Sequence, residues 1–124
     1  MILKDDFFTI ENQNNDGDNA EFCIKLNQEH YIYKAHFPNN PITPGVCIVQ
    51  MVKEVYSHII RKKLFLNKIK NLKFNYPIIP TKNEYVTMKI NRTLEEEGVH
   101  NLKVEFRDSE TLFSKMNMQL RDLT

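Results

Sequence analysis

The sequence has little of what marks several classes of protein. It contains only two cysteines, Cys23 and Cys47, which lie in apolar stretches and lack the spacing of a metal-ligand pair. A disulfide framework is therefore not expected, and we interpret both residues as buried thiols. No apolar run approaches the ~20 residues that a membrane span needs. The first residues carry acid where a secretory signal has basic residues and a long apolar stretch, so a cytoplasmic protein outside the membrane is expected.

An excess of charge of either sign is also missing. The net charge is +1 although 27% of the residues are charged, which gives no argument that the protein as a whole binds nucleic acid or a membrane surface. The chain has 124 residues, of which 41% are hydrophobic, and this suffices for one hydrophobic core. We find no repeat or linker, so one domain over residues 1–124 is expected.

The first third of the chain predicts extended structure without a long helix. Residues 11–19 are polar and predict a loop. Apolar and polar residues alternate over 20–26, which predicts a half-buried strand, and 31–35 predicts a second short extended segment. Three prolines follow within seven residues and exclude a helix through this stretch, because proline lacks an amide donor and clashes with the preceding turn.

One long helix is predicted from Pro44 to Lys63, with proline in the first turn, where its missing N–H costs nothing. Its first turns are apolar almost all round, and Gln50, Glu54, Ser57 and Arg61 form a polar stripe. Only strands are expected after it, over 69–76, 86–90, 102–106 and 116–120. This order predicts an α+β protein in which one helix packs against an antiparallel sheet.

The segment from His36 to Gln50 contains the candidate chemistry. His36 lies in a proline-stiffened loop that leads into the helix, and Gly45 lies in the first helical turn, where backbone N–H groups have no intrahelical partner. Such free amides, at the positive end of the helix dipole, suit a developing oxyanion. A nearby histidine could remove a proton next to a carbonyl. From the residues alone, the favoured interpretation is a histidine that merely caps or packs the loop.

The motif His36-Phe37-Pro38-x-x-Pro41-x-x-Pro44-Gly45-Val46 resembles the signature of the 3-hydroxyacyl-acyl-carrier-protein dehydratases. A second stretch, Ile69 to Pro80, resembles the strand and turn that follow the helix in that family, so the resemblance extends over residues 20 to 120. It implies a hot-dog fold, in which an antiparallel sheet wraps one long central helix. It also implies a homodimer with two acyl channels at the subunit interface, and no cofactor or metal.

The resemblance implies β-elimination of water from a 3-hydroxyacyl thioester on acyl carrier protein, giving the trans-2-enoyl product. His36 would remove the α-proton, and the Gly45 amide would polarise the thioester carbonyl. Phe37, Pro44 and Val46 would complete the oxyanion and substrate-binding loop.

One departure concerns the acid that protonates the leaving hydroxyl. The family has Glu or Asp fourteen residues after the histidine, where this chain has Gln50, and commonly has Gln one helical turn later, where this chain has Glu54. A carboxamide cannot donate a proton and regenerate as an acid does. Glu54 could deliver the proton directly or through a water held by Gln50, His36 could transfer it alone, or the site could bind without turnover. We favour a working but altered dehydratase.

A basic cluster at the end of the predicted helix, Arg61, Lys62 and Lys63, has two interpretations. It is either the usual charge bias of a helix C-terminus or a docking patch for acyl carrier protein and its phosphopantetheine-linked acyl group. Two further functions stay open for the chain. One is a non-catalytic hot-dog subunit that binds acyl thioesters or pairs with an active paralogue, which Gln50 favours. The other is an acyl thioesterase, although such enzymes of this fold usually carry a carboxylate in place of the histidine.

Overall fold

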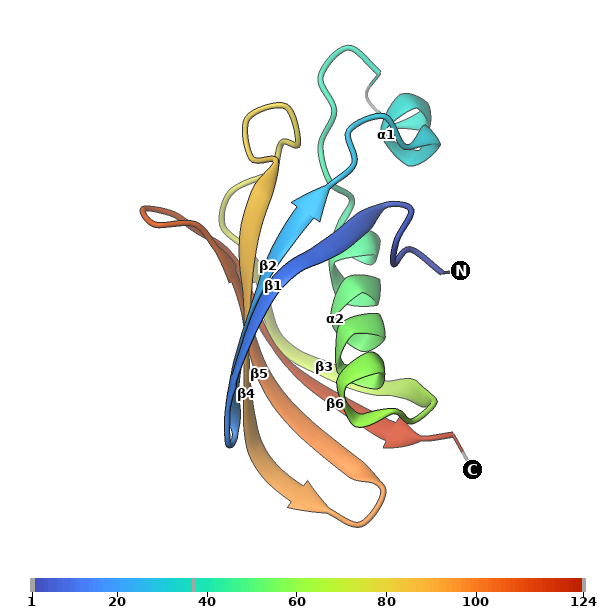
Figure 1. Ribbon diagram of the computed structural model, residues 1–124, viewed down its shortest axis with the longest axis vertical. Coiled ribbons are helices and arrows are strands. Elements are labelled where there is room, and N and C mark those ends of the chain that lie inside the picture. The colour runs from blue at the N-terminus through green and yellow to red at the C-terminus, as the bar shows by residue number, and fades with distance from the viewer. Residues whose placement is uncertain (1, 37, 124) are drawn as a thin grey trace.

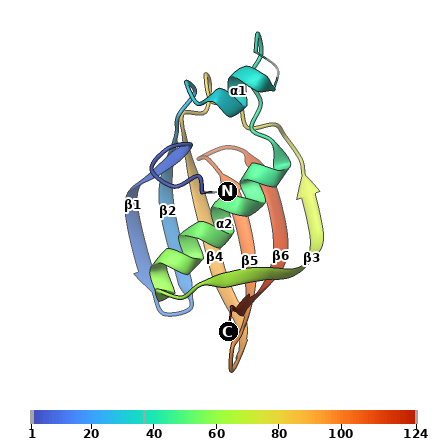
Figure 2. The same cartoon turned by 90° about the vertical axis from the view of Figure 1, so that its right-hand side faces the viewer.

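The computed structural model describes residues 2–36 and 38–123, without the side chains of Leu94 and Glu95. Its elements follow the order β1 (Phe8–Asp16), β2 (Asn19–Leu26), α1 (Tyr31–Ala35), α2 (Gly45–Ile60), β3 (Leu64–Phe74), β4 (Tyr85–Glu96), β5 (Val99–Arg107) and β6 (Leu112–Asp122). Within the described residues, the strands form one antiparallel sheet of six in the order β1-β2-β4-β5-β6-β3. The sheet curves around α2, which lies across its concave face (Figures 1 and 2).

The core lies between α2 and the concave face of the sheet. The helix contributes the buried side chains Cys47, Ile48, Met51, Val52, Val55 and Tyr56. Every second residue of β5 and β6 points toward them, including Val104, Phe106, Met116 and Met118. The alternation of buried residues in these strands and the apolar first turns of the helix therefore both arise from packing in one core. The α+β prediction is confirmed.

The predicted helix and the four strands after it are present with shifted ends. α2 stops at Ile60 because Arg61 takes a left-handed conformation with φ 56°, and its N–H donates to the Ser57 carbonyl. The chain reverses there, so β3 begins at Leu64 instead of residue 69. The strands predicted at 86–90, 102–106 and 116–120 lie inside the longer β4, β5 and β6.

Two predictions in the first third of the chain were wrong. Residues 11–16, which we expected in a loop, belong to β1, where all of them are exposed and residues 12–16 pair with β2 at the outer edge of the sheet. An edge strand can be polar because its pairing depends on backbone hydrogen bonds rather than on buried side chains. Only the reversal at Gly17, with φ 59°, is a turn.

Residues 31–35, which we expected to be extended, form the short helix α1. His30 caps it, because its Nδ1 accepts a hydrogen bond from the Ile32 amide at 3.1 Å. Of the aromatic and β-branched residues that suggested a strand, Ile32 and Tyr33 are buried in this helix, whereas Tyr31 is exposed. No helix within the described residues is long and apolar enough to cross a membrane.

Candidate active site

His36 ends α1 at the point where the proline-rich loop begins. Its backbone N–H donates to the Ile32 carbonyl at 3.0 Å, which makes it the C-terminal cap of this helix. Its side chain is exposed, and its ring has no polar partner among residues 2–36 and 38–123. A single chain therefore does not enclose His36, and its place in an acyl channel stays a prediction. Phe37, the next residue of the motif, lies outside the described residues.

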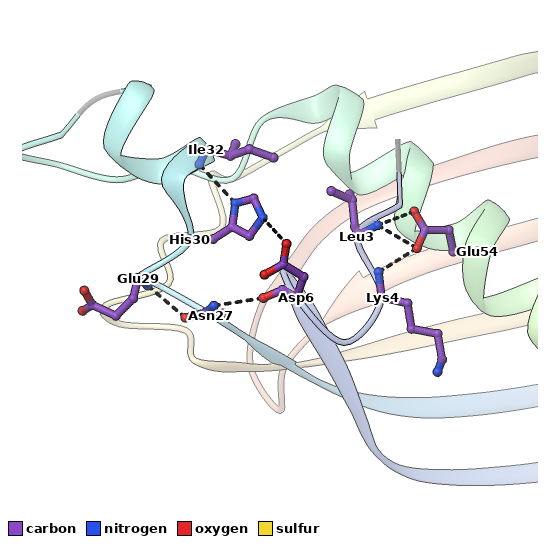
Figure 3. A network of polar contacts seen from close by, with 8 residues as sticks. All are labelled: Leu3, Lys4, Asp6, Asn27, Glu29, His30, Ile32 and Glu54. Atoms are coloured by element: carbon purple, nitrogen blue, oxygen red, sulfur yellow. Dashed lines mark hydrogen bonds and ion pairs between the residues drawn. The ribbon is translucent and has the colours of Figure 1, made fainter.

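α1 is fastened on its N-terminal side by a turn formed by the first residues of the chain. His30 is buried, and its Nε2 lies 3.1 Å from Oδ2 of Asp6, while its Nδ1 caps α1 (Figure 3). Asn27 donates a second hydrogen bond, at 2.9 Å, to the backbone carbonyl of Asp6. These contacts hold the helix that ends in His36 against the N-terminal turn.

α1 is also tied to the far end of the proline-rich loop. The hydroxyl of Tyr33 lies 2.9 Å from Oγ1 of Thr43, and both side chains are buried. Burial raises the pKa of Tyr33 well above its usual value, so this hydroxyl keeps its proton near neutral pH. The contact joins a residue near His36 to a residue near Gly45.

Gly45 starts α2 beside a pocket of about 330 Å³. Pro44 takes the N-cap position instead of the first turn, so α2 begins one residue later than predicted, and the Pro44 carbonyl accepts from the Cys47 and Ile48 amides. The amides of Gly45 and Val46 have no partner within the described part of the chain. They remain available to an oxyanion at the positive end of the helix.

The ring of Phe74 lies against Gly45. A Cβ built on Gly45 would lie 2.8 Å from Cζ of Phe74, closer than side chains tolerate. Phe74 belongs to β3 and also lines the pocket, together with Ile42, Ile48 and Tyr76. Val46 is 68% exposed and points away from the core. The missing side chain therefore lets the edge strand approach the start of α2.

Gln50 and Glu54 lie one turn apart on α2 and contact each other. Nε2 of Gln50 donates to Oε2 of Glu54 at 2.8 Å. Glu54 also accepts the backbone amide of Leu3, 2.9 Å from each carboxylate oxygen, and that of Lys4 at 2.7 Å (Figure 3). Each of these contacts uses the carboxylate as an acceptor. Glu54 thus holds the N-terminal turn on α2, a role the sequence did not indicate.

The basic cluster follows directly in the chain. Arg61 and Lys63 are exposed, and Nζ of Lys62 lies 3.3 Å from Oδ2 of Asp122 at the end of β6. The three residues line one open groove that also includes Gln50 and Glu54. The candidate acid position and the basic cluster therefore share one face of α2.

The structure brings Gln50, Glu54 and the basic cluster to one groove, and places Gly45 beside a separate pocket. Within residues 2–36 and 38–123, no polar contact joins His36 to either group. The described residues contain no group of three His, Cys, Asp or Glu side chains that could hold a metal ion. Sequence reasoning missed Leu3, Lys4, Tyr33 and Thr43, because their partners lie far away in the chain or across the loop.

Comparison with known proteins identifies similar sequences. The ApeI-like family, described as ApeI dehydratase, matches residues 12–117. The chain is 33% identical over 75 residues to the 3-hydroxyacyl-[acyl-carrier-protein] dehydratase FabZ of Rhizobium etli (strain CIAT 652), covering 52% of this chain and 47% of that protein. It is 34% identical over 76 residues to FabZ of Brucella ovis, covering 52% of this chain and 47% of that protein. The chain thus spans about half the length of the curated relatives it matches.

Solved structures confirm the hot-dog fold. The dehydratase heterocomplex ApeI:P from Xenorhabdus doucetiae superposes with a TM-score of 0.72 at 18% identity, covering 90% of this chain and 96% of that one. A putative thioesterase, yhdA from Lactococcus lactis, superposes with a TM-score of 0.64 at 14% identity, covering 93% of this chain and 91% of that one. At these identities the likeness concerns the fold alone.

Proposed function

This chain belongs to the ApeI-like dehydratase family, and on that premise we propose that it removes water from 3-hydroxyacyl thioesters to give trans-2-enoyl thioesters. The FabZ relatives are named for 3-hydroxyacyl groups on acyl carrier protein, which supports a carrier-bound substrate here, in fatty acid, lipid or polyene synthesis. The observation that carries the proposal is that the amides of Gly45 and Val46, at the start of α2, have no partner among the described residues. They lie at the end of the proline-rich loop that begins at His36.

The reaction starts at the α-carbon of the bound thioester. The imidazole of His36 takes the α-proton, and the electrons move toward the thioester oxygen, which the Gly45 amide stabilises. The bond between the β-carbon and its hydroxyl oxygen then breaks as the double bond forms. The hydroxyl leaves as water once it receives a proton.

His36 is the proton donor that the contacts support best. Glu54 already accepts the amides of Leu3 and Lys4 and the carboxamide of Gln50. To act as the acid, directly or through a water on Gln50, it would have to give up these donors. Elimination on one face of the substrate leaves the imidazolium near the departing hydroxyl, so the proton taken from carbon is returned to oxygen. Histidine ends the cycle neutral.

A second copy of the chain would enclose this site. β3 pairs with β6 on one side only among the described residues, and it exposes Phe65, Leu66, Leu72 and Phe74. Val46 and Tyr76, beside the Gly45 pocket, are exposed as well. Apolar surface on an unpaired sheet edge favours association of two copies along that edge. We propose that the homodimer buries His36 and completes the acyl channel.

The basic cluster would receive the carrier protein. Lys53, Arg61 and Lys63 line the groove that reaches Gln50 and Glu54, and among the described residues of its lining Glu54 alone is acidic. The positive charge of this groove complements an acidic carrier protein and increases the rate at which the two proteins meet. The phosphopantetheine arm would then reach the site from this face.

The test is a pair of assays on one purified protein. Ultraviolet absorbance follows enoyl thioester formation from a 3-hydroxyacyl thioester, and a thiol reagent follows hydrolysis. We expect enoyl product without free thiol, and loss of nearly all turnover in His36→Ala while the dimer stays intact. Free thiol without enoyl product would instead assign a thioesterase.

A non-catalytic subunit is the second candidate, because Gln50 stands where the family has an acid. The name of the ApeI:P heterocomplex supports pairing with a different subunit. On this alternative the wild type forms no enoyl product, whereas Gln50→Glu creates the activity. Activity in the wild type contradicts it.

A further inference from the structure

Two buried hydroxyl groups join the ends of the proline-rich loop. Tyr33 precedes His36 by three residues, and Thr43 precedes Gly45 by two. Their side chains are 1% and 4% exposed, and the oxygens lie 2.9 Å apart. We propose that Tyr33 and Thr43 are positioning residues, whose hydrogen bond sets the location of His36 relative to the Gly45 amide. This inference rests on the proposed dehydration.

Each partner is fixed to a different part of the fold. The ring of Tyr33 stacks on Phe7 with centroids 4.9 Å apart and planes at 21°, and Phe7 is fully buried. The backbone amide of Thr43 donates to the Ile78 carbonyl at 2.9 Å, in the segment that follows β3. The hydrogen bond therefore links the N-terminal turn and α1 to the segment beside the start of α2. α1 lies beyond this end of α2 in both views (Figures 1 and 2).

The loop between the two residues has little structure of its own. Among the described residues 38–42, no backbone amide or carbonyl takes part in a backbone hydrogen bond. Residues 38–40 are exposed, and the prolines at 38 and 41 have no amide to donate. The prolines stiffen the loop but do not fix its two ends to each other. The Tyr33–Thr43 bond does so on the side nearest the core.

Small displacements matter because His36 and Gly45 must act on one thioester at once. The base must reach the α-proton while the amide contacts the carbonyl oxygen, and a misplacement of about 1 Å can cost ~100-fold in rate. Breaking the bond while keeping both side chains buried should permit part of such a shift. We expect a loss of about tenfold in kcat.

A purely structural role is the competing explanation, because buried hydroxyls need partners wherever they are. Tyr56 provides a matched control. It is also buried, and its hydroxyl lies 3.3 Å from Nδ1 of His100, toward the other end of α2. Tyr56→Phe removes the same atom as Tyr33→Phe from the same kind of environment, away from the proline-rich loop.

The experiment compares Tyr33→Phe, Thr43→Val, their combination, Thr43→Ser and Tyr56→Phe. The first two should each lower kcat about tenfold with KM within twofold, and the combination should lose no more than either, as expected for one shared contact. Thr43→Ser keeps the hydroxyl and should retain kcat. Tyr56→Phe should lower the melting temperature as much as Tyr33→Phe does, yet keep kcat.

Three results overturn the inference: an unchanged kcat in Tyr33→Phe, an equal loss in Tyr56→Phe, or additive losses in the combination. A second readout does not depend on turnover. Tyr33→Phe should shift the nuclear magnetic resonance signals of the His36 ring and the Gly45 amide, while Tyr56→Phe should leave both in place. An inactive wild type overturns the proposed function. Independently of activity, the inference is overturned if Tyr33→Phe leaves the signals of the His36 ring and the Gly45 amide unchanged.

Discussion

Replacing Glu54 separates an anchoring role from a catalytic one. The carboxylate accepts the Leu3 amide, 2.9 Å from both oxygens, and the Lys4 amide at 2.7 Å. Glutamine keeps one acceptor oxygen and replaces the other with an NH2 group, which then faces other donors. Because Oε1 accepts both amides, Glu54→Gln can keep the two contacts without their charge, a loss about equal to one charged contact, whereas Glu54→Ala loses both contacts.

The cost follows from the kind of contact that is lost. A hydrogen bond to a charged group contributes about 1.5–3 kcal/mol, and we take the lower value because Glu54 is half-buried. We then expect a loss of about 1.5 kcal/mol in Glu54→Gln and about 3 kcal/mol in Glu54→Ala. In a chain of 124 residues, 1 kcal/mol corresponds to roughly 4 °C, which gives decreases of about 6 and 12 °C in melting temperature.

Three measurements on the same samples decide the matter: thermal unfolding, hydrogen exchange at the Leu3 and Lys4 amides, and the rate of dehydration. Both amides should exchange faster in the two variants, while dehydration stays within about threefold if His36 alone moves the proton. Glu21→Gln is the control, because Glu21 forms an exposed ion pair with Lys89 at 3.3 Å and its replacement should cost less than about 1 kcal/mol.

Two outcomes would refute this reasoning about Glu54. Unchanged melting and unchanged exchange at Leu3 and Lys4 would show that the carboxylate anchors nothing. A loss of about 100-fold or more in dehydration, with normal melting, would assign Glu54 as the acid instead.

Three further predictions concern other parts of the chain. Gly45→Ala should cost about 1–3 kcal/mol of stability and slow dehydration, because its Cβ would lie 2.8 Å from Phe74. Adding Phe74→Leu to this variant should restore the melting temperature, and a double variant that does not recover would contradict the argument. The hydrogen bond from His100, with a smaller contribution from a neighbouring lysine, holds the pKa of Asp122 below its usual range. The ionised Asp122 side chain therefore stabilises the fold above the usual carboxyl pKa, and this stabilisation is lost as pH falls through the lowered pKa. The difference in unfolding free energy between the wild type and Asp122→Asn should therefore shrink at acid pH. A difference that does not depend on pH would refute this. Lys63→Glu should weaken turnover of a carrier-bound substrate and spare a small thioester mimic, whereas equal loss would argue against docking at this groove.

The parts of the fold that could be predicted are those in which one face is buried. The apolar start of α2 and the alternation in β5 and β6 follow directly from packing against a common core. The polar strand β1 could not be predicted, because edge pairing through the backbone leaves no mark in side-chain polarity. α1 has five residues, too few for a helical period to be recognised, and its cap is a histidine.

The candidate site also has parts that could be predicted from the sequence and parts that could not. The motif from His36 to Val46 is local and could be recognised as a string of residues. The contact between Glu54 and Leu3 joins residues 51 positions apart, and the Tyr33–Thr43 bond depends on how α1 folds back over the loop. Such contacts are set by tertiary packing, which a single sequence does not reveal.

Phe74 has one further consequence. Its ring lies on the unpaired edge of the sheet, half exposed, and also lies over Gly45 at the mouth of the pocket. A second chain that covers this edge and a thioester that enters the pocket both meet the same ring. Binding events that bias one shared element are thermodynamically linked, and the linkage has the same magnitude in both directions. If the ring moves on binding, a substrate analogue will change the association constant between two chains by some factor. Association of the chains will then change the affinity for the analogue by the same factor.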